Sequence, residues 1–278
     1  MTVLLEGENL VKTYGRGRRA FTALDGVGFR LEAGRTLGVV GSSGSGKTTL
    51  GELAGGLQRP TSGRVLFRGA DVAGLDATDR RAFRRAVQFV FQDPAASMDP
   101  GYTVARVVSE PLDMFERGMG AREKRERVLE MLERVGLGPE TADRRPRGLS
   151  GGQCQRVAIA RALVARPSVV VCDECTSALD VSVQAQILNL LRDLQGELGI
   201  AYLFVSHDIG VVSYMADDVL VMRHGRAVES GPAADVFANP RDPYTKALLS
   251  SAEPLEEEDE LEAPADAELT ERGRGTAR

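Results

Sequence analysis

The chain has 278 residues, of which 42% are hydrophobic and 27% are charged. This is the composition of an ordinary globular protein with one sizeable core. No apolar run approaches the roughly 20 residues that span a bilayer, residues 1–7 lack a secretory signal pattern, and three cysteines are too few for a disulfide framework. These features argue against an integral membrane protein and predict a cytoplasmic one.

The net charge of −5 is concentrated at the C-terminal end of the chain. Residues 253–278 contain ten acidic residues and three arginines, a local charge of −7, which leaves +2 for residues 1–252. Because the segment 253–278 has little apolar surface to bury, we expect an acidic disordered tail. The nearly neutral remainder has no basic stripe, so the sequence predicts no nucleic-acid partner.

The first part of the chain is predicted to form strands and then helices. Strands are expected in residues 3–11, 22–31 and 36–40, where apolar runs are separated by glycine-containing turns. After another strand in residues 87–91, the segment from about 93 to 165 carries apolar residues three and four positions apart. We therefore expect several strands before the first helix and a helical insertion from about 93 to 165.

The second half resumes an alternation of strands and helices. Residues 169–172 are fully apolar, which is typical of a central parallel strand. A long amphipathic helix over 183–198, a strand in 201–205 and a hairpin within 219–229 follow. Residues 232–252, approximately, retain apolar residues at helical spacing and are predicted to be a C-terminal extension that packs on the body. This alternation predicts an open α/β sheet.

The stretch Gly41–Thr48, with the sequence GSSGSGKT, fits the phosphate-loop pattern G-x-x-x-x-G-K-[ST]. Its glycines allow backbone N–H groups to turn toward a polyphosphate. Lys47 supplies a positive charge to the terminal phosphates, and Thr48 offers a hydroxyl group to Mg²⁺. With a strand before it and a helix after it, the loop directs a helix N-terminus at the phosphates.

Two acidic residues follow the apolar strand of residues 169–172. Asp173 is placed where its carboxylate can reach Mg²⁺ held by Thr48. Glu174 comes next, and a second carboxylate beside the metal ligand can orient or deprotonate a water molecule for attack on the γ-phosphate. Lys47 and the metal would stabilise the charge of the transition state.

The stretch Leu149–Gln153, with the sequence LSGGQ, predicts a helix start. Ser150 and Gln153 have the S-x-x-Q spacing of a capping box. Gly151 and Gly152 destabilise a first helical turn, and we interpret them as allowing backbone N–H groups to approach a ligand closely. The sequence thus predicts a second phosphate-binding helix terminus.

These stretches occur in a known order together with others. The chain resembles the ATP-binding subunits of ABC transporters over roughly residues 3–250, on the evidence of Gly41–Thr48, Gln92, Leu149–Gln153, Cys172–Glu174, Ser177–Asp180 and Ser206–Asp208. The resemblance implies an α/β fold in residues 1–252, the P-loop NTPase fold of an ABC-type ATPase domain, with an N-terminal antiparallel β subdomain and an inserted α-helical subdomain. It also implies that two such domains form a head-to-tail sandwich, in which each ATP contacts the phosphate loop of one and the Ser150–Gln153 terminus of the other.

The resemblance gives each matched residue a role. Tyr14 would stack on adenine, Gln92 would sense Mg²⁺ and the attacking water, His207 would contact the γ-phosphate and hold Glu174, and Asp180 would join the halves of the dimer. The expected ATP contacts are Tyr14, Gly41, Ser42, Ser43, Gly44, Ser45, Gly46, Lys47, Thr48, Thr49, Ser150, Gly151, Gly152, Gln153 and Asp180. Thr48, Gln92 and Asp173 are expected to bind Mg²⁺, and Lys47, Gln92, Glu174 and His207 to take part in catalysis.

Two segments, Phe91–Pro100 and Asn239–Leu249, are similar to the dipeptide, oligopeptide and nickel uptake branch of the family. Asp242 stands where that branch usually has histidine, Cys154 replaces a more usual Gln or Arg, and Cys175 replaces the proline that commonly follows the catalytic glutamate. No cysteine follows Cys175, so no iron–sulfur centre is predicted. Cys175 could alter the geometry of Glu174.

This branch implies an ATPase at the cytoplasmic face of the membrane. Its expected partners are permease subunits, a second ATP-binding subunit of the same or a different sequence, and, indirectly, an extracytoplasmic solute-binding protein. Two alternatives stay open: a soluble ABC ATPase not coupled to transport, and a regulatory subunit that hydrolyses ATP weakly.

Overall fold

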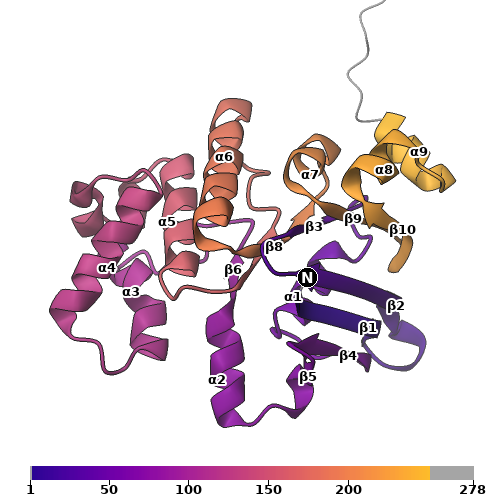
Figure 1. Cartoon of the computed structure of the whole chain (residues 1–278), viewed down its shortest axis with the longest axis horizontal. Coiled ribbons are helices and arrows are strands. Elements are labelled where there is room, and N and C mark those ends of the chain that lie inside the picture. Colours follow the sequence, from indigo (N-terminus) through magenta and orange to yellow (C-terminus); the bar gives the residue numbers. More distant parts are fainter. Residues whose placement is uncertain (1, 251–278) are drawn as a thin grey trace, which may run out of the picture.

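Two sheets and the helices packed around them make up residues 2–250, the part of the chain that the computed structural model describes (Figure 1). The acidic tail predicted for residues 253–278 lies outside the described residues. The helical insertion is at the left of Figure 1, the antiparallel sheet at the lower right, and the last helices at the upper right.

The antiparallel sheet is formed mainly by the N-terminal strands, in the order β2-β1-β4-β5. Leu5 of β1 lies between Leu31 of β2 and Phe67 of β4, so one face of the sheet is apolar. β1 continues to Tyr14, three residues beyond the predicted end, because Tyr14 pairs with Phe21 of β2. The strands are β1 (Val3–Tyr14), β2 (Phe21–Glu32), β4 (Ser62–Phe67) and β5 (Ala70–Asp71).

The second sheet has six strands in the order β10-β9-β3-β8-β7-β6 and is parallel except for its edge strand β10. The pairings Val40↔Ser206, Asp173↔Val205 and Val90↔Cys172 align the carboxyl ends of four neighbouring strands. The segments that follow these ends therefore meet at one edge of the sheet. The strands are β3 (Thr36–Val40), β6 (Val87–Val90), β7 (Val169–Asp173), β8 (Ala201–Ser206), β9 (Asp218–Arg223) and β10 (Arg226–Pro232).

One hydrophobic cluster joins the two sheets. It contains Leu24 of the antiparallel sheet, Leu203 of the parallel sheet and Leu50 of α1 (Lys47–Ala54), all fully buried. The helix that carries the phosphate-loop lysine is thus anchored on both sheets. The short helices η1 (Gly17–Arg19), η2 (Val72–Gly74) and α2 (Ala77–Ala86) connect the strands around this cluster.

The helical insertion packs around α5 (Gly151–Leu163) and shares its core with the parallel sheet. Val108 of α3, Leu132 of α4 and Ile159 of α5 belong to the same cluster as Cys172 of β7 and Leu191 of α6. The insertion is therefore fixed to the sheet rather than separate from it. Its elements are α3 (Val104–Phe115), α4 (Ala121–Arg134), η3 (Pro139–Asp143), η4 (Pro146–Gly148) and α5, and α6 spans Val181–Leu198.

The last helices cover the opposite end of the parallel sheet. Val236 of α8 (Ala233–Ala238) and Leu248 of α9 (Pro243–Ser250) pack in a cluster with Val40 of β3 and Val212 of α7 (Ile209–Met215). The fold class predicted from the sequence is confirmed: an α/β sheet, an antiparallel β sheet and a set of inserted helices.

Candidate active site

The phosphate loop connects β3 to α1 at the aligned edge of the parallel sheet. Gly44 and Gly46 have φ values of 75° and 102°, in the left-handed region that glycine adopts without strain. A Cβ on Gly46 would lie 2.6 Å from the carbonyl oxygen of Ala23, so a larger residue does not fit. Gly46 is also the N-cap of α1 and has no side chain to bond the first amides of the helix. These N–H groups can serve an anion instead.

Lys47 is 4% exposed, and its ammonium group lies inside the loop. Nζ donates hydrogen bonds to the carbonyl oxygens of Gly41, at 2.8 Å, and Ser42, at 3.0 Å. Burial lowers the pKa of the lysine, and the nearby carboxylates of Glu174 and Asp173 oppose this shift. A polyphosphate would add charged acceptors to these neutral carbonyl groups, because an ammonium group has three N–H donors.

Thr48 and Asp173 come together although 125 residues separate them. The hydroxyl group of Thr48 donates to Oδ1 of Asp173 over 3.1 Å. Burial raises the pKa of Asp173, while the hydrogen bond from Thr48 acts in the opposite direction. Mg²⁺ prefers a carboxylate and a few hard oxygen ligands besides phosphate and water, so this pair of oxygen donors fits the ion.

Glu174 is held from two sides just after β7. Its Oε2 accepts a hydrogen bond from Nε2 of Gln92 over 3.1 Å, and its Oε1 lies 3.4 Å from Nδ1 of His207. Its backbone N–H donates to the carbonyl oxygen of Val205, and its φ of 46° is unusual for a residue other than glycine. The side chain is 18% exposed, so the carboxylate is both oriented and reachable.

The cysteine that follows Glu174 points the other way. Cys175 is 2% exposed and belongs to the hydrophobic core that also contains Cys172 and Phe204. A hydrogen bond with Cys175 and burial raise the pKa of the Cys172 thiol well above its usual range. Cysteine at position 175 is therefore compatible with the interactions that Glu174 makes with Gln92 and His207.

The Ser150–Gln153 terminus forms the predicted capping box. Gln153 N–H donates to Oγ of Ser150, and Ser150 N–H donates to Oε1 of Gln153. A Cβ on Gly152 would lie 2.7 Å from Cγ1 of Val183, whereas a Cβ on Gly151 would have only ordinary contacts. Packing against α6 thus accounts for Gly152 without a ligand. Within residues 2–250, no hydrogen bond or ion pair links this terminus to the phosphate loop.

Asp180 and Tyr14 have local partners in the structure. Asp180 caps α6, because its Oδ1 accepts hydrogen bonds from Val183 N–H at 2.9 Å and from the Ser182 hydroxyl at 2.7 Å. Tyr14 is 38% exposed at the end of β1, and its hydroxyl donates to Gln58. A partly exposed aromatic ring can stack on a base, so the proposed adenine contact stays a prediction. Ser43 is exposed, and Thr49 is partly buried in the first turn of α1.

The phosphate loop also contacts a residue far along the chain. Ser42 N–H donates to the hydroxyl oxygen of Tyr244, 202 residues later in the chain, over 2.8 Å. Tyr244 lies in the segment Asn239–Leu249, whose sequence indicates the family branch and no contact with the phosphate loop. A backbone hydrogen bond also stabilises the loop: Gly225 N–H, in the turn between β9 and β10, donates to the carbonyl oxygen of Ser45. No sequence pattern signals either contact, because both depend on tertiary packing.

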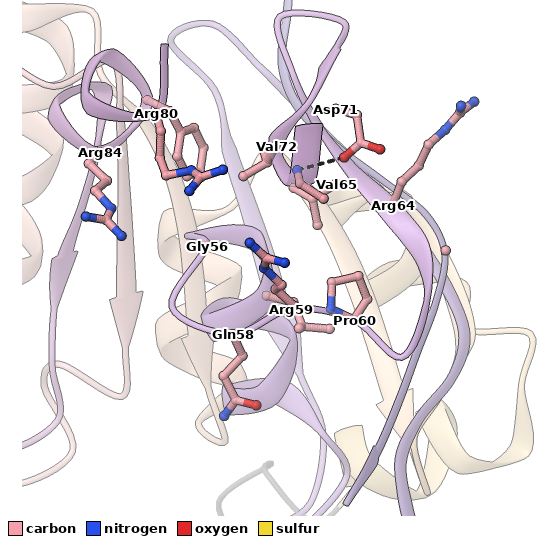
Figure 2. A pocket seen from close by; sticks show the side chains of 14 residues that line it. Gly56, Gln58, Arg59, Pro60, Arg64, Val65, Asp71, Val72, Arg80 and Arg84 are labelled. Atoms are coloured by element: carbon pink, nitrogen blue, oxygen red, sulfur yellow. Dashed lines mark hydrogen bonds between the residues drawn. The ribbon is translucent and has the colours of Figure 1, made fainter. Parts of the chain in front are cut away.

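A separate cavity lies between α2 and the antiparallel sheet (Figure 2). Arg59 and Arg80 extend into it, whereas Arg64 points outward and pairs with Glu8. Its lining contains none of the predicted site residues. It is therefore distinct from the candidate active site. Among residues 2–250, no helix has the length and apolarity needed to cross a membrane.

Comparison with known proteins identifies the family. A sequence model described as ABC transporter matches residues 24–177, and one described as oligopeptide/dipeptide transporter, C-terminal region, matches residues 228–275. The dipeptide transport ATP-binding protein DppF of Haemophilus influenzae is 48% identical over 256 residues, which cover 90% of this chain and 78% of the relative. The oligopeptide transport ATP-binding protein OppF of Salmonella typhimurium is 46% identical over 233 residues, 84% of this chain and 70% of the relative.

Solved structures show the same fold. The ATP-binding cassette MJ0796, solved as a dimer in a post-hydrolysis state with bound ADP and Pi, is 34% identical, with a TM-score of 0.75 over 83% of this chain and 99% of its own. The protein cbiO1 of Clostridium perfringens, part of the ABC transporter complex cbiONQ, is 33% identical, with a TM-score of 0.76 over 86% of this chain and 92% of its own. The predicted resemblance is confirmed: this chain belongs to the ABC transporter family as one of its ATP-binding, ATP-hydrolysing proteins.

Proposed function

We propose that this chain is the ATP-hydrolysing subunit of an importer for peptides or a related small solute. It works at the cytoplasmic face of the membrane with a separate permease and a second ATP-binding subunit, and a solute-binding protein delivers the solute from outside. The relatives named as dipeptide and oligopeptide transport ATP-binding proteins support this assignment. The observation that carries hydrolysis is the carboxylate of Glu174, held between Gln92 and His207 beside the Thr48–Asp173 pair.

The site residues divide the work of hydrolysis. The phosphate-loop N–H groups and Lys47 bind the polyphosphate, and Thr48 and Asp173 would hold Mg²⁺. When bound, Mg²⁺ neutralises phosphate charge and supports the leaving oxygen. Glu174 accepts a proton from the attacking water, and Gln92 and His207 keep its carboxylate oriented. Because the carboxylate is already oriented, the entropic cost of positioning the base during the reaction is lower.

We infer that the complete site needs a second subunit. The Ser150–Gln153 terminus, with Ser150 and Gly151 exposed, makes no hydrogen bond to the phosphate loop within residues 2–250, so it is available to a nucleotide on another molecule. A neighbour whose structure is dimeric, MJ0796, supports this arrangement. In that dimer Asp180, at the start of α6, would lie near the junction of the two halves.

The permease is proposed to dock in a groove between the parallel sheet and the insertion. The groove has a volume of about 890 Å³ and is lined by apolar side chains such as Phe89, Phe91 and Met114, with Arg84 and Glu110 among its charged residues. Met114 is 57% and Phe91 37% exposed, which is costly for large apolar side chains unless a partner covers them. Gln92 follows Phe91 directly, so the groove adjoins the hydrolytic site.

Replacing Glu174 by Gln tests the proposal. The variant preserves size and one hydrogen-bonding oxygen but cannot accept the proton, so turnover of the chain assembled with its permease should fall about 10²- to 10⁴-fold. ATP binding should persist. If wild type and variant hydrolyse ATP equally slowly, Glu174 is not the base and the weakly hydrolysing regulatory subunit gains support. If the protein copurifies with RNA or ribosomes and with no membrane protein, the importer assignment is wrong.

A further inference from the structure

The peptide group between Gly41 and Ser42 has both of its polar ends engaged. Its N–H, on Ser42, donates to the hydroxyl oxygen of Tyr244 over 2.8 Å. Its carbonyl oxygen, on Gly41, accepts a hydrogen bond from Nζ of Lys47, also over 2.8 Å. The peptide group is planar, so fixing the direction of the N–H also fixes the direction of the carbonyl. One rigid unit therefore connects the C-terminal helix α9 to the phosphate-binding lysine.

Tyr244 is itself held firmly at the start of α9. Its N–H donates to Oδ1 of Asp242 over 2.7 Å. The carboxylate of Glu229, on β10, accepts from Arg241 N–H at 2.8 Å and from Asp242 N–H at 3.1 Å. These bonds tie the turn before α9 to the edge strand of the parallel sheet, so the phenol is presented from a fixed backbone.

The ring of Tyr244 has a second support. The guanidinium carbon of Arg223, at the end of β9, lies 5.0 Å from the ring centroid, within the range of a cation–π contact. The ring also packs in the cluster that contains Val40, the last residue before the phosphate loop. The position of the hydroxyl group is thus set independently of its bond to Ser42.

We propose that Tyr244 is a positioning residue for nucleotide binding, which acts through the Gly41–Ser42 peptide to hold Lys47 in the phosphate loop. Because Ser42 is exposed, water can replace the phenol as an acceptor, but it cannot fix the orientation of the peptide. Without Tyr244 the loop must become ordered when it binds phosphate, and this ordering weakens binding. The inference deepens the proposed function, because it concerns the same ATP site.

The test is Tyr244→Phe in the full chain, which removes the hydroxyl group and keeps the ring under Arg223. Loss of one neutral hydrogen bond predicts an ATP dissociation constant, measured by calorimetry, roughly 2- to 10-fold higher. In the assembled transporter the KM for ATP should rise by a similar factor with little change in kcat, because Lys47 contacts phosphate both before and during the reaction. The melting temperature of the nucleotide-free chain should stay close to that of wild type.

Tyr214→Phe is the matched control. Tyr214 also has a guanidinium over its ring, that of Arg192 at 4.7 Å, and its hydroxyl also bonds to a single residue, Asn189, but these contacts lie between α6 and α7. Loss of the Tyr214 hydroxyl group should leave ATP affinity unchanged. Wild-type affinity in Tyr244→Phe, or equal weakening in both variants, would overturn the inference. Calorimetry with the isolated chain needs no permease or peptide, so its outcome is independent of whether import is the correct function.

Discussion

Gly152 tests whether packing or ligand approach explains the glycine pair at the start of α5. Normal carbon–carbon contacts are about 3.5–4.0 Å, and a Cβ on Gly152 would lie 2.7 Å from Cγ1 of Val183. Val183 is β-branched and within a helix, so its side chain has little freedom to rotate away. Overpacking of this kind costs about 1–3 kcal/mol. The better helix propensity of alanine offsets about 1 kcal/mol of this cost. We expect Gly152→Ala to destabilise the chain by up to about 2 kcal/mol.

A double-mutant cycle with Val183→Ala isolates the steric cost. This second change removes Cγ1, so Gly152→Ala should be neutral or slightly stabilising in the Val183→Ala background. The coupling free energy, obtained from urea unfolding of the four nucleotide-free proteins, should be about 1–3 kcal/mol. Gly151→Ala is the control, because its Cβ would come no closer than 3.7 Å to Leu179, so the better helix propensity of alanine should stabilise the chain by up to about 1 kcal/mol. An equal cost of Gly152→Ala with and without Val183 would refute the packing explanation.

Two further predictions concern the dimer site and the cap of α6. Ser150→Arg should leave the ATP affinity of the isolated chain unchanged and abolish ATP hydrolysis in the dimer. Lys47→Ala should weaken ATP binding in the isolated chain. An equal loss of ATP binding in both variants would contradict a site shared between two subunits. Hydrogen bonds from Val183 N–H and the Ser182 hydroxyl lower the pKa of Asp180, so the carboxylate stabilises the fold above the ordinary carboxyl pKa of about 4. Asp180→Ala should therefore lower the melting temperature at pH 7, and the difference should narrow as the pH falls below about 4; a constant difference would show that the carboxylate charge is irrelevant.

The features predicted best from the sequence are those encoded by neighbouring residues. The capping box of Ser150 and Gln153 spans four residues, and the phosphate loop is defined by glycines whose backbone angles are local. Glu174, Gln92 and His207 follow parallel strands, and the aligned ends of those strands bring them together as the fold implies.

The remaining features depend on contacts across the fold. The sequence predicts the end of β1 too early in the chain. Pairing of Tyr14 with Phe21 extends the strand, and no local signal marks that pairing. The packing of Gly152 against Val183 becomes visible only when α5 and α6 are side by side, so the sequence alone offers ligand approach as its reason. The bond between Tyr244 and Ser42 joins residues 202 apart, so its functional meaning could not be inferred from either segment alone.

Helix α5 connects the two surfaces through which this protein is proposed to work. At 13 residues it is about 20 Å long, and it is buried along most of its length, so it should move as a stiff rod. Ser150 at one end faces the proposed partner subunit. Arg161 near the other end donates to the carbonyl and hydroxyl oxygens of Ser97, and both residues line the proposed permease groove. Because α5 packs in the core that it shares with the parallel sheet, a displacement of Ser150 as two subunits close on ATP would be transmitted through that core to the residues that line the proposed permease groove.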